Sequence, residues 1–159
     1  MNASSTKRLR FGDVVRIVTP QGAAVAQYIH KHPDFGAVVR VIGPDTPERQ
    51  QESPDVVARR PTQFVTMFPL GPACHRGIAQ IIGQAPVPIE HRDFPMFRQA
   101  LRLDPRDRGP CNWLLWDGET EQIVPSLTPE QYALPLRAIM NDTLLVERTL
   151  SGWTSTQER

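Results

Sequence analysis

The sequence predicts an α+β domain of mainly antiparallel strands, which form a strongly bent sheet or partly open barrel with one or two short C-terminal helices. The first observation behind this prediction is the content of 16 prolines in 159 residues, roughly double the usual share of about 5%. Proline inside a helix removes a hydrogen bond and clashes with the preceding turn, at a cost of about 3 kcal/mol. Between Pro20 and Pro135 the longest stretch without proline is 111–124, which leaves little room for a bundle of long helices.

Runs of β-branched residues joined by short turns are the second observation. Segments 14–19 and 37–42 are rich in valine and isoleucine, and segment 24–30 between them carries further apolar residues. Turn-forming residues separate these segments at 20–22 and 32–36. Because short turns join neighbouring strands that run in opposite directions, the three segments predict an antiparallel meander.

Segment 43–62 predicts a long surface loop instead. It carries four prolines among charged and amide side chains, and one helical turn is expected at 55–59. Loops of this length are often functional or mobile, but a tolerated insertion is the favoured interpretation. Two more strands are expected after it, at 64–68 and 76–82, with a turn at 69–72 between them.

The third observation is a hairpin signature in the second half of the chain. Segments 111–116 and 119–124 flank Asp117-Gly118, a pair that favours the type I′ turn because both central positions need positive φ. Before the hairpin, 85–89 and 94–98 predict extended chain, since residues that precede proline avoid the α region.

Two short helices are expected after the hairpin. Thr128 can cap a helix with proline at its first position, and Gln131 completes a capping box. Pro135 keeps that helix short. A second helix is expected to begin at residue 141 or 142.

A single globular domain is expected over residues 11–153, between frayed ends at 1–10 and 154–159. The hydrophobic content of 40% suffices for a packed core, which argues against disorder. The apolar residues expected to share that core are Val15, Ile17, Val39, Val41, Phe64, Phe68, Ile78, Ile82 and Leu115.

The charge balance argues against nucleic acid and membranes as partners. The chain has 18 basic and 17 acidic side chains, for a formal net charge of +1, whereas binding to polyanions calls for a clustered positive excess. No secretory signal is visible before Phe11, and no run of about 20 apolar residues is present. A cytoplasmic location is therefore expected, with Cys74 and Cys111 as free thiols.

Histidine and cysteine are weak candidates for metal binding or catalysis. His30 and His32 are two apart, so on a strand both would project to one face. Further metal ligands could come from Cys74, His75 and His91, but the usual zinc-binding spacings are absent. Cys74 and His75, as neighbours on a strand, would point apart and could not form a nucleophile–base pair. No catalytic residue, metal or cofactor is therefore expected.

Two groups of charged residues have weak functional signals. Segment 92–108 holds five arginines that could contact phosphate. Interleaved acidic residues nearly cancel their charge, and no glycine-rich phosphate loop occurs, which argues against nucleic-acid binding. The carboxylates at 117, 119 and 121 are expected to form a solvated edge of the hairpin.

Trp113 and Trp116 are three residues apart, so on a regular strand their side chains face opposite sides. One of them is expected in the core. The other either belongs to a partner surface, where tryptophan is enriched, or is covered by a helix or loop.

Four segments carry a likeness to a known family: Gly12-Asp13 with the strand up to Ile17, residues 64–77, Phe94-Pro-Met-Phe-Arg98, and Trp113-Leu-Leu-Trp-Asp-Gly118. Together they resemble the immunity protein 26 family of bacterial polymorphic toxin systems. The resemblance implies a cytoplasmic protein that neutralises a toxin by binding it. It supplies no catalytic residue to carry over.

The favoured hypothesis is a non-catalytic interaction protein whose partner is another protein, such as a toxin domain. One alternative is a small-ligand-binding or enzymatic barrel with a pocket lined by Arg98, Trp116 and Asp117. The other is a nucleic-acid-binding barrel with a one-sided arginine stripe. Together with Trp113, the three pocket residues are the candidate interaction residues.

Overall fold

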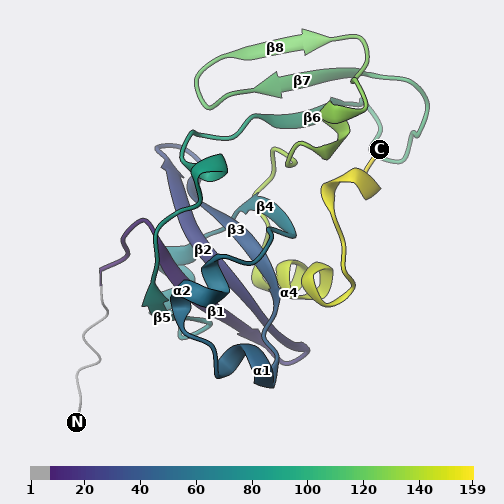
Figure 1. Cartoon of the computed structure of the whole chain (residues 1–159). Helices are drawn as coiled ribbons and strands as arrows, with labels where there is room; N and C mark the ends of the chain where they lie inside the picture. The colour runs from purple at the N-terminus through teal and green to yellow at the C-terminus, as the bar shows by residue number, and fades with distance from the viewer. Residues whose placement is uncertain (1–7) are drawn as a thin grey trace.

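The N-terminal meander forms the centre of a five-stranded antiparallel sheet in the computed structural model, which describes residues 8–159 (Figure 1). Its strand order is β4-β3-β2-β1-β5. The strands are β1 (Asp13–Thr19), β2 (Gly22–His32), β3 (Gly36–Pro44), β4 (Phe64–Met67) and β5 (Ala79–Gln84). The predicted α+β class, the antiparallel pairing and the meander are confirmed.

A second sheet has three strands in the order β6-β7-β8 and lies over one end of the first sheet (Figure 1). It consists of β6 (Phe97–Leu101), β7 (Asn112–Trp116) and β8 (Glu121–Val124). The described strands are therefore divided between two sheets that do not close into a barrel. The physical reason lies in the linking segment 85–96, where Pro86, Pro88 and Pro95 lack the N–H groups that would continue a strand ladder.

The hairpin β7–β8 is confirmed, but the predicted turn type is wrong. Gly118 has a φ of 98°, whereas no residue other than glycine has positive φ in the described chain. Asp117 instead accepts hydrogen bonds through Oδ1 from the backbone N–H groups of Glu119 and Thr120, at 2.9 and 2.7 Å. The Asp117 carboxylate thus takes the place of a backbone acceptor in the turn. The turn held by this side chain spans the four residues 117–120.

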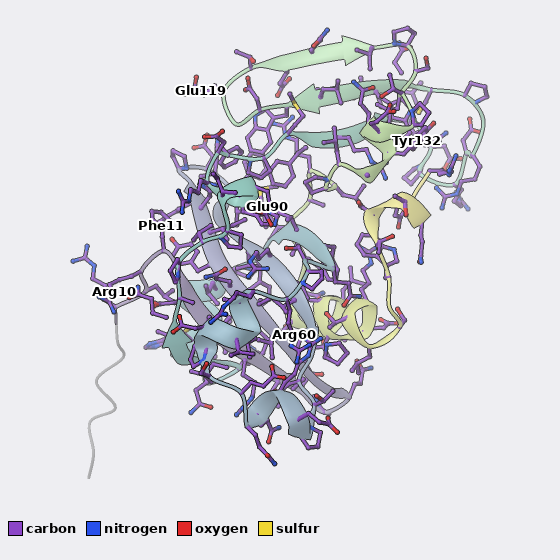
Figure 2. All side chains as sticks on the ribbon, in the orientation of Figure 1. Arg10, Phe11, Arg60, Glu90, Glu119 and Tyr132 are labelled. Atoms are coloured by element: carbon purple, nitrogen blue, oxygen red, sulfur yellow. The ribbon has the colours of Figure 1, made fainter. Side chains whose placement is uncertain are left out.

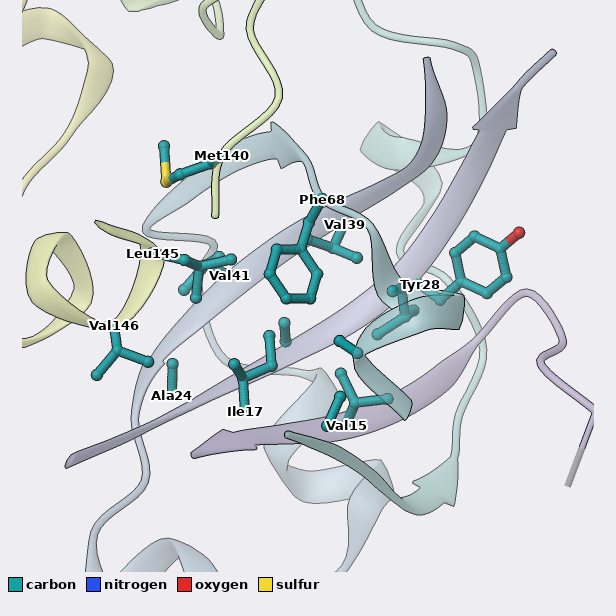
Figure 3. Packing of buried hydrophobic residues seen from close by; sticks show 14 of the residues in the cluster. Val15, Ile17, Ala24, Tyr28, Val39, Val41, Phe68, Met140, Leu145 and Val146 are labelled. Carbon is teal, nitrogen blue, oxygen red and sulfur yellow. The ribbon is translucent and has the colours of Figure 1, made fainter. Parts of the chain in front are cut away.

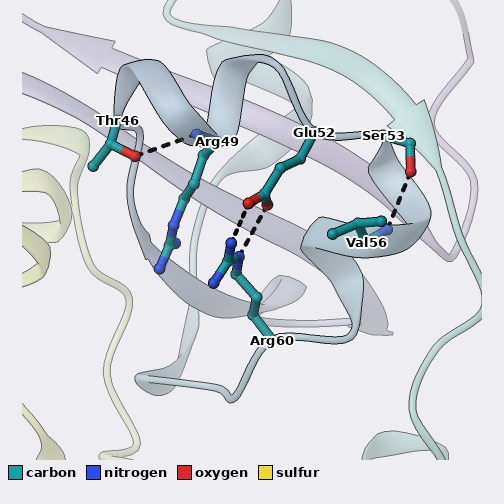
Figure 4. A network of polar contacts seen from close by, with 6 residues as sticks. All are labelled: Thr46, Arg49, Glu52, Ser53, Val56 and Arg60. Atoms are coloured by element: carbon teal, nitrogen blue, oxygen red, sulfur yellow. Dashed lines mark hydrogen bonds and ion pairs between the residues drawn. The ribbon is translucent and has the colours of Figure 1, made fainter.

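Segment 43–62 contains two short helices, α1 (Pro47–Gln50) and α2 (Pro54–Ala58), where one helical turn was expected at 55–59. Each helix begins with proline and is capped by the preceding hydroxyl, as Figure 4 shows for Thr46 and Ser53. Figure 4 also shows Glu52 paired with Arg60 across the segment. Local capping thus gives this proline-rich segment regular structure.

The turn expected at 69–72 is wrong, because α3 (Leu70–His75) occupies that position. Pro72 lies in the first turn of α3, where a backbone N–H has no intrahelical acceptor to lose. Gly77, with φ of 77°, then turns the chain into β5. The strand therefore begins at Ala79, later than the expected residue 76.

The C-terminal helices agree with the local sequence signals. Thr128 and Gln131 form the predicted capping box, with reciprocal hydrogen bonds of 2.9 and 3.3 Å, although the element is the 3₁₀ turn η2 (Glu130–Ala133). The helix α4 (Asp142–Leu150) begins after Asn141, whose side chain accepts from the Leu144 N–H at 2.7 Å. Two further 3₁₀ turns are η1 (Ile89–His91) and η3 (Ser155–Gln157).

The main core lies between one face of the large sheet and the helices α3 and α4, as Figure 3 shows. The sheet's other face is covered by α2 at one end and by the small sheet at the other. Since both faces are covered, β2 and β3 bury consecutive residues instead of alternating ones. Seven of the nine expected core residues belong to or pack on the main core, but Ile82 and Leu115 lie in separate clusters. No helix in residues 8–159 has both the length and the apolar character that crossing a membrane requires.

Candidate functional site

Trp116 holds the two sheets together and is 3% exposed. Its ring lies 5.5 Å from that of Phe97, 5.0 Å from that of Phe35 and 4.8 Å from the imidazole of His32. The guanidinium of Arg137 lies over it at 4.6 Å. Because this face of β7 packs against the large sheet, Trp116 is a structural anchor and not a contact surface.

Trp113 lies on the opposite, outer face of the small sheet, so the predicted opposition of the two rings is confirmed. It is also buried, at 5% exposure, because the segment from Leu127 to Leu134 covers it. The ring of Tyr132 on that segment stands edge-on to Trp113 at 5.9 Å; Figure 2 labels this tyrosine. Of the two alternatives for the second tryptophan, the covered one is therefore correct.

Arg98 lies beside Trp113 and is 1% exposed, with its guanidinium 5.2 Å from the Trp113 ring. It donates to four backbone carbonyls and to no carboxylate in the described chain. The acceptors and distances are Leu134 (3.3 Å), Tyr132 (3.2 Å), Ser155 (2.6 Å) and Glu158 (2.6 Å). Burial lowers the pKa of Arg98, and the nearby Glu158 partly opposes this shift. Segment 154–159, expected to be frayed, is thus tied to the small sheet by this side chain.

Asp117 is at the exposed end of the hairpin, away from that buried arginine. The hydrogen bonds from Thr120 and Glu119 lower the pKa of its carboxyl. Arg98, Trp116 and Asp117 therefore do not line a common pocket: the first points outward from the small sheet, the second inward, and the third serves the turn.

The histidines considered as metal ligands make hydrogen bonds within the fold instead. Nε2 of His30 contacts the carbonyl of His91 at 2.8 Å, and Nε2 of His32 contacts that of Gly118 at 2.8 Å. No group of three or more potential metal ligands occurs in residues 8–159. Both contacts join β2 to segments leading into or within the small sheet, so these side chains help fix how the two sheets dock.

His91 forms a second polar contact, at 2.8 Å between its Nε2 and Oγ1 of Thr62. Burial lowers the pKa of His91, and the positive charge of Arg40 lowers it further. Oγ1 of Thr62 also accepts from Nη1 of Arg40 at 3.1 Å. In the neutral tautomer with the proton on Nδ1, Nε2 of His91 would accept the hydroxyl proton of Thr62. The thiol of Cys74 also has a raised pKa, first because of burial and then because of the negative charge of Asp13.

The outer face of the small sheet carries two adjoining hollows, of about 260 and 550 Å³. Four residues line both of them: Arg102, Arg108, Trp113 and Arg159. Arg98 lies at the base of the first hollow and Tyr132 at the side of the second. We call this paired hollow the arginine groove. Figure 1 shows the C-terminal end of the chain beside the loop between β6 and β7. This proximity brings the walls of the arginine groove together.

A larger hollow of about 730 Å³ lies between α2 and segment 85–92. Its lining has mixed charge, with Asp55 and Glu90 among the arginines Arg59, Arg60 and Arg92. Arg60 is already paired with Glu52. The charged side chains of the arginine groove are more uniformly positive than those of the larger hollow. Of these two sites, only the groove is lined by tryptophan and tyrosine.

Sequence reasoning found Arg98 and Trp113 but missed the groove. The signal for Arg102 and Arg108 was the dense arginine run at 92–108, which was discounted because acidic residues interleave with it. Arg159 gave no local signal, since its position beside β6 depends on the path of the whole C-terminal segment.

No family model, curated protein or solved structure matches this chain.

Proposed function

We propose that this protein acts by binding another protein without doing chemistry itself, in the manner of an immunity protein that neutralises a bacterial toxin in the cytoplasm. The observation that carries this proposal is the arginine groove. Arginine, tyrosine and tryptophan are the residue types most enriched among those that dominate binding energy in protein interfaces. The groove brings Arg102, Arg108 and Arg159 together with Tyr132, above the buried Trp113.

The groove also has the rigidity that favours binding. Trp113 is fixed between Arg98 and Tyr132, and Arg98 ties the C-terminal segment to the sheet. A surface that is already ordered before binding loses less conformational entropy when a partner docks. Two of the four segments that resemble an immunity family meet in the small sheet, where Phe97 and Arg98 of β6 pair with Trp116 and Leu115 of β7.

The test is capture of a partner by the purified full-length chain, followed by reconstitution of the complex from separately purified components. The proposal expects a stoichiometric complex by calorimetry, and growth arrest by the partner alone that co-expression of this chain relieves. The double variant Arg102→Gln/Arg108→Gln should weaken the complex, and Arg59→Gln/Arg92→Gln in the mixed-charge hollow is the matched control. If no captured protein forms a stoichiometric complex, the proposal is wrong.

A catalytic role is the second candidate, and the Thr62–His91 contact is the observation in its favour. A hydroxyl that donates to a neutral imidazole resembles a nucleophile–base pair. However, Arg40 donates into the same hydroxyl oxygen and withdraws electron density from it. Hydrolysis of a model ester or phosphoester that disappears in His91→Gln, while the variant stays folded, would favour this candidate over the first.

A further inference from the structure

We propose that the arginine groove binds the carboxylate side chains of an acidic segment in the partner protein. This inference rests on the proposed function and names the chemistry of the surface that the partner would present. It is carried by the charge of the groove and by the free guanidinium donors of its walls and base.

The lining of the groove has a strong excess of positive charge. Glu158 is its single acidic residue, and Oε1 of this side chain is held by Nη2 of Arg148 at 3.1 Å. The three arginines Arg102, Arg108 and Arg159 form no ion pair with a carboxylate in the described part of the chain. Three like charges held on one wall repel each other, so an anion that enters between them stabilises the arrangement.

The base of the groove offers a hydrogen-bond donor that the fold does not use. The four bonds of Arg98 come from Nε and Nη2, which leaves its Nη1 without an acceptor in residues 8–159. Arg98 lines the first hollow of the groove, and its Nη1 is not among the side-chain nitrogens that the described chain buries without a partner. This donor is therefore accessible from the groove, where an entering carboxylate oxygen would accept a charge-assisted hydrogen bond from it.

The wall arginines keep free donors. Nη1 of Arg102 donates to the Gly109 carbonyl at 2.5 Å, and Nη1 of Arg108 donates to the Pro105 carbonyl at 3.3 Å. The guanidinium of Arg159 lies 4.9 Å from the Tyr132 ring centre. Each guanidinium therefore has N–H groups left over, and its planar fork can bind a carboxylate through two parallel hydrogen bonds.

The charge around the groove favours a short acidic segment over a nucleic acid. Asp104 and Asp107 lie on the same loop as Arg108 and limit the positive region to the groove itself. The chain has a formal net charge of only +1, whereas binding of a long phosphate backbone calls for an extended positive excess. A positive region of this limited extent matches a few carboxylates of a protein segment.

The experiment measures binding of fluorescein-labelled hexaglutamate to the full-length chain by fluorescence anisotropy, with hexaglutamine and a short single-stranded oligonucleotide as comparison probes. Hexaglutamate should bind, hexaglutamine should not, and raising the salt from roughly 20 to 300 mM should weaken binding. Arg102→Gln/Arg108→Gln should lose about tenfold or more in affinity. The matched control Arg59→Gln/Arg92→Gln should lose less than about twofold, and thermal melts check that both variants are folded.

Three outcomes would overturn the inference: hexaglutamate binds no better than hexaglutamine, both double variants lose affinity equally, or the oligonucleotide binds more tightly through the same arginines. Its failure is separable from that of the proposed function. A captured partner that binds the wild type and Arg102→Gln/Arg108→Gln equally refutes the acidic-segment inference alone. Groove-dependent hexaglutamate binding without any stoichiometric protein partner refutes the proposed function alone.

Discussion

Replacing Arg98 with methionine tests whether this buried side chain holds the C-terminal segment against the small sheet. Methionine keeps a long apolar stem beside Trp113 but removes all four hydrogen bonds to backbone carbonyls. Two of those carbonyls, on Ser155 and Glu158, lie 57 and 60 residues along the chain from Arg98. We therefore expect both a loss of global stability and local release of the segment.

The size of the effect follows from two opposing terms. Hydrogen bonds from a charged donor contribute roughly 1.5–3 kcal/mol each. Nε and Nη2 of Arg98 share three N–H groups among the four carbonyls, so they contribute on the order of 4.5–9 kcal/mol. Removing the charge also removes its burial penalty of several kcal/mol, and the carbonyls near the surface regain water. A net loss of about 3 kcal/mol remains, which lowers Tm by roughly 6–12 °C for a domain of this size.

Urea unfolding followed by tryptophan fluorescence measures the global term, and hydrogen exchange of residues 153–159 measures the local one. Arg102→Met is the matched control, because the half-buried Arg102 makes a single bond, to the Gly109 carbonyl, and should cost about 1 kcal/mol or less. The structural role assigned to Arg98 would be refuted by two results together. The free energy of unfolding of Arg98→Met would lie within about 1 kcal/mol of the wild-type value, and hydrogen exchange in 153–159 would be unchanged.

Three further predictions concern the contacts between and within the sheets. The lowered pKa of His91 means that the unfolded chain binds more protons, so stability should fall as the pH drops from about 6.5 through the folded-state pKa; urea midpoints should show this slope for the wild type and a flatter one for His91→Gln. Gly118→Ala should destabilise by about 1–3 kcal/mol in thermal melts, because φ is 98° and the added Cβ would lie 2.8 Å from the Phe94 ring; unchanged melting would contradict that geometry. Asp117→Ala should speed hydrogen exchange of the turn amides, and the wild-type turn should loosen as the pH falls through the lowered pKa of Asp117; equal exchange in both proteins would argue against the side-chain turn.

Local signals in the sequence predicted local structure well. Proline spacing and β-branched runs located the meander, since they act on the backbone of the residues that carry them. The capping pair Thr128–Gln131 and the cap at Asn141 were predicted for the same reason. The errors at 69–72 and at the hairpin turn were also local: proline is tolerated in the first turn of a helix, and the Asp117 carboxylate replaces the backbone geometry of a type I′ turn.

Long-range contacts decided what the sequence could not. The alternation along β7 established that Trp113 and Trp116 face opposite sides, but not that segment 127–134 would cover the outer ring. Arg98 could be noticed as one of a run of arginines, yet its role depends on carbonyls at 132–134 and 155–158. The same holds for Arg159, which reaches the groove only because those bonds bring the chain end back to β6.

By itself, then, the sequence determined the α+β class, the antiparallel strands and the places where helices begin, because backbone sterics and capping act within a few residues. The tertiary structure decided the division into two sheets, the burial of both tryptophans and the convergence of arginines on one face. Those features depend on side chains meeting across tens of residues, where packing and hydrogen bonding select one arrangement among many that share the same local preferences.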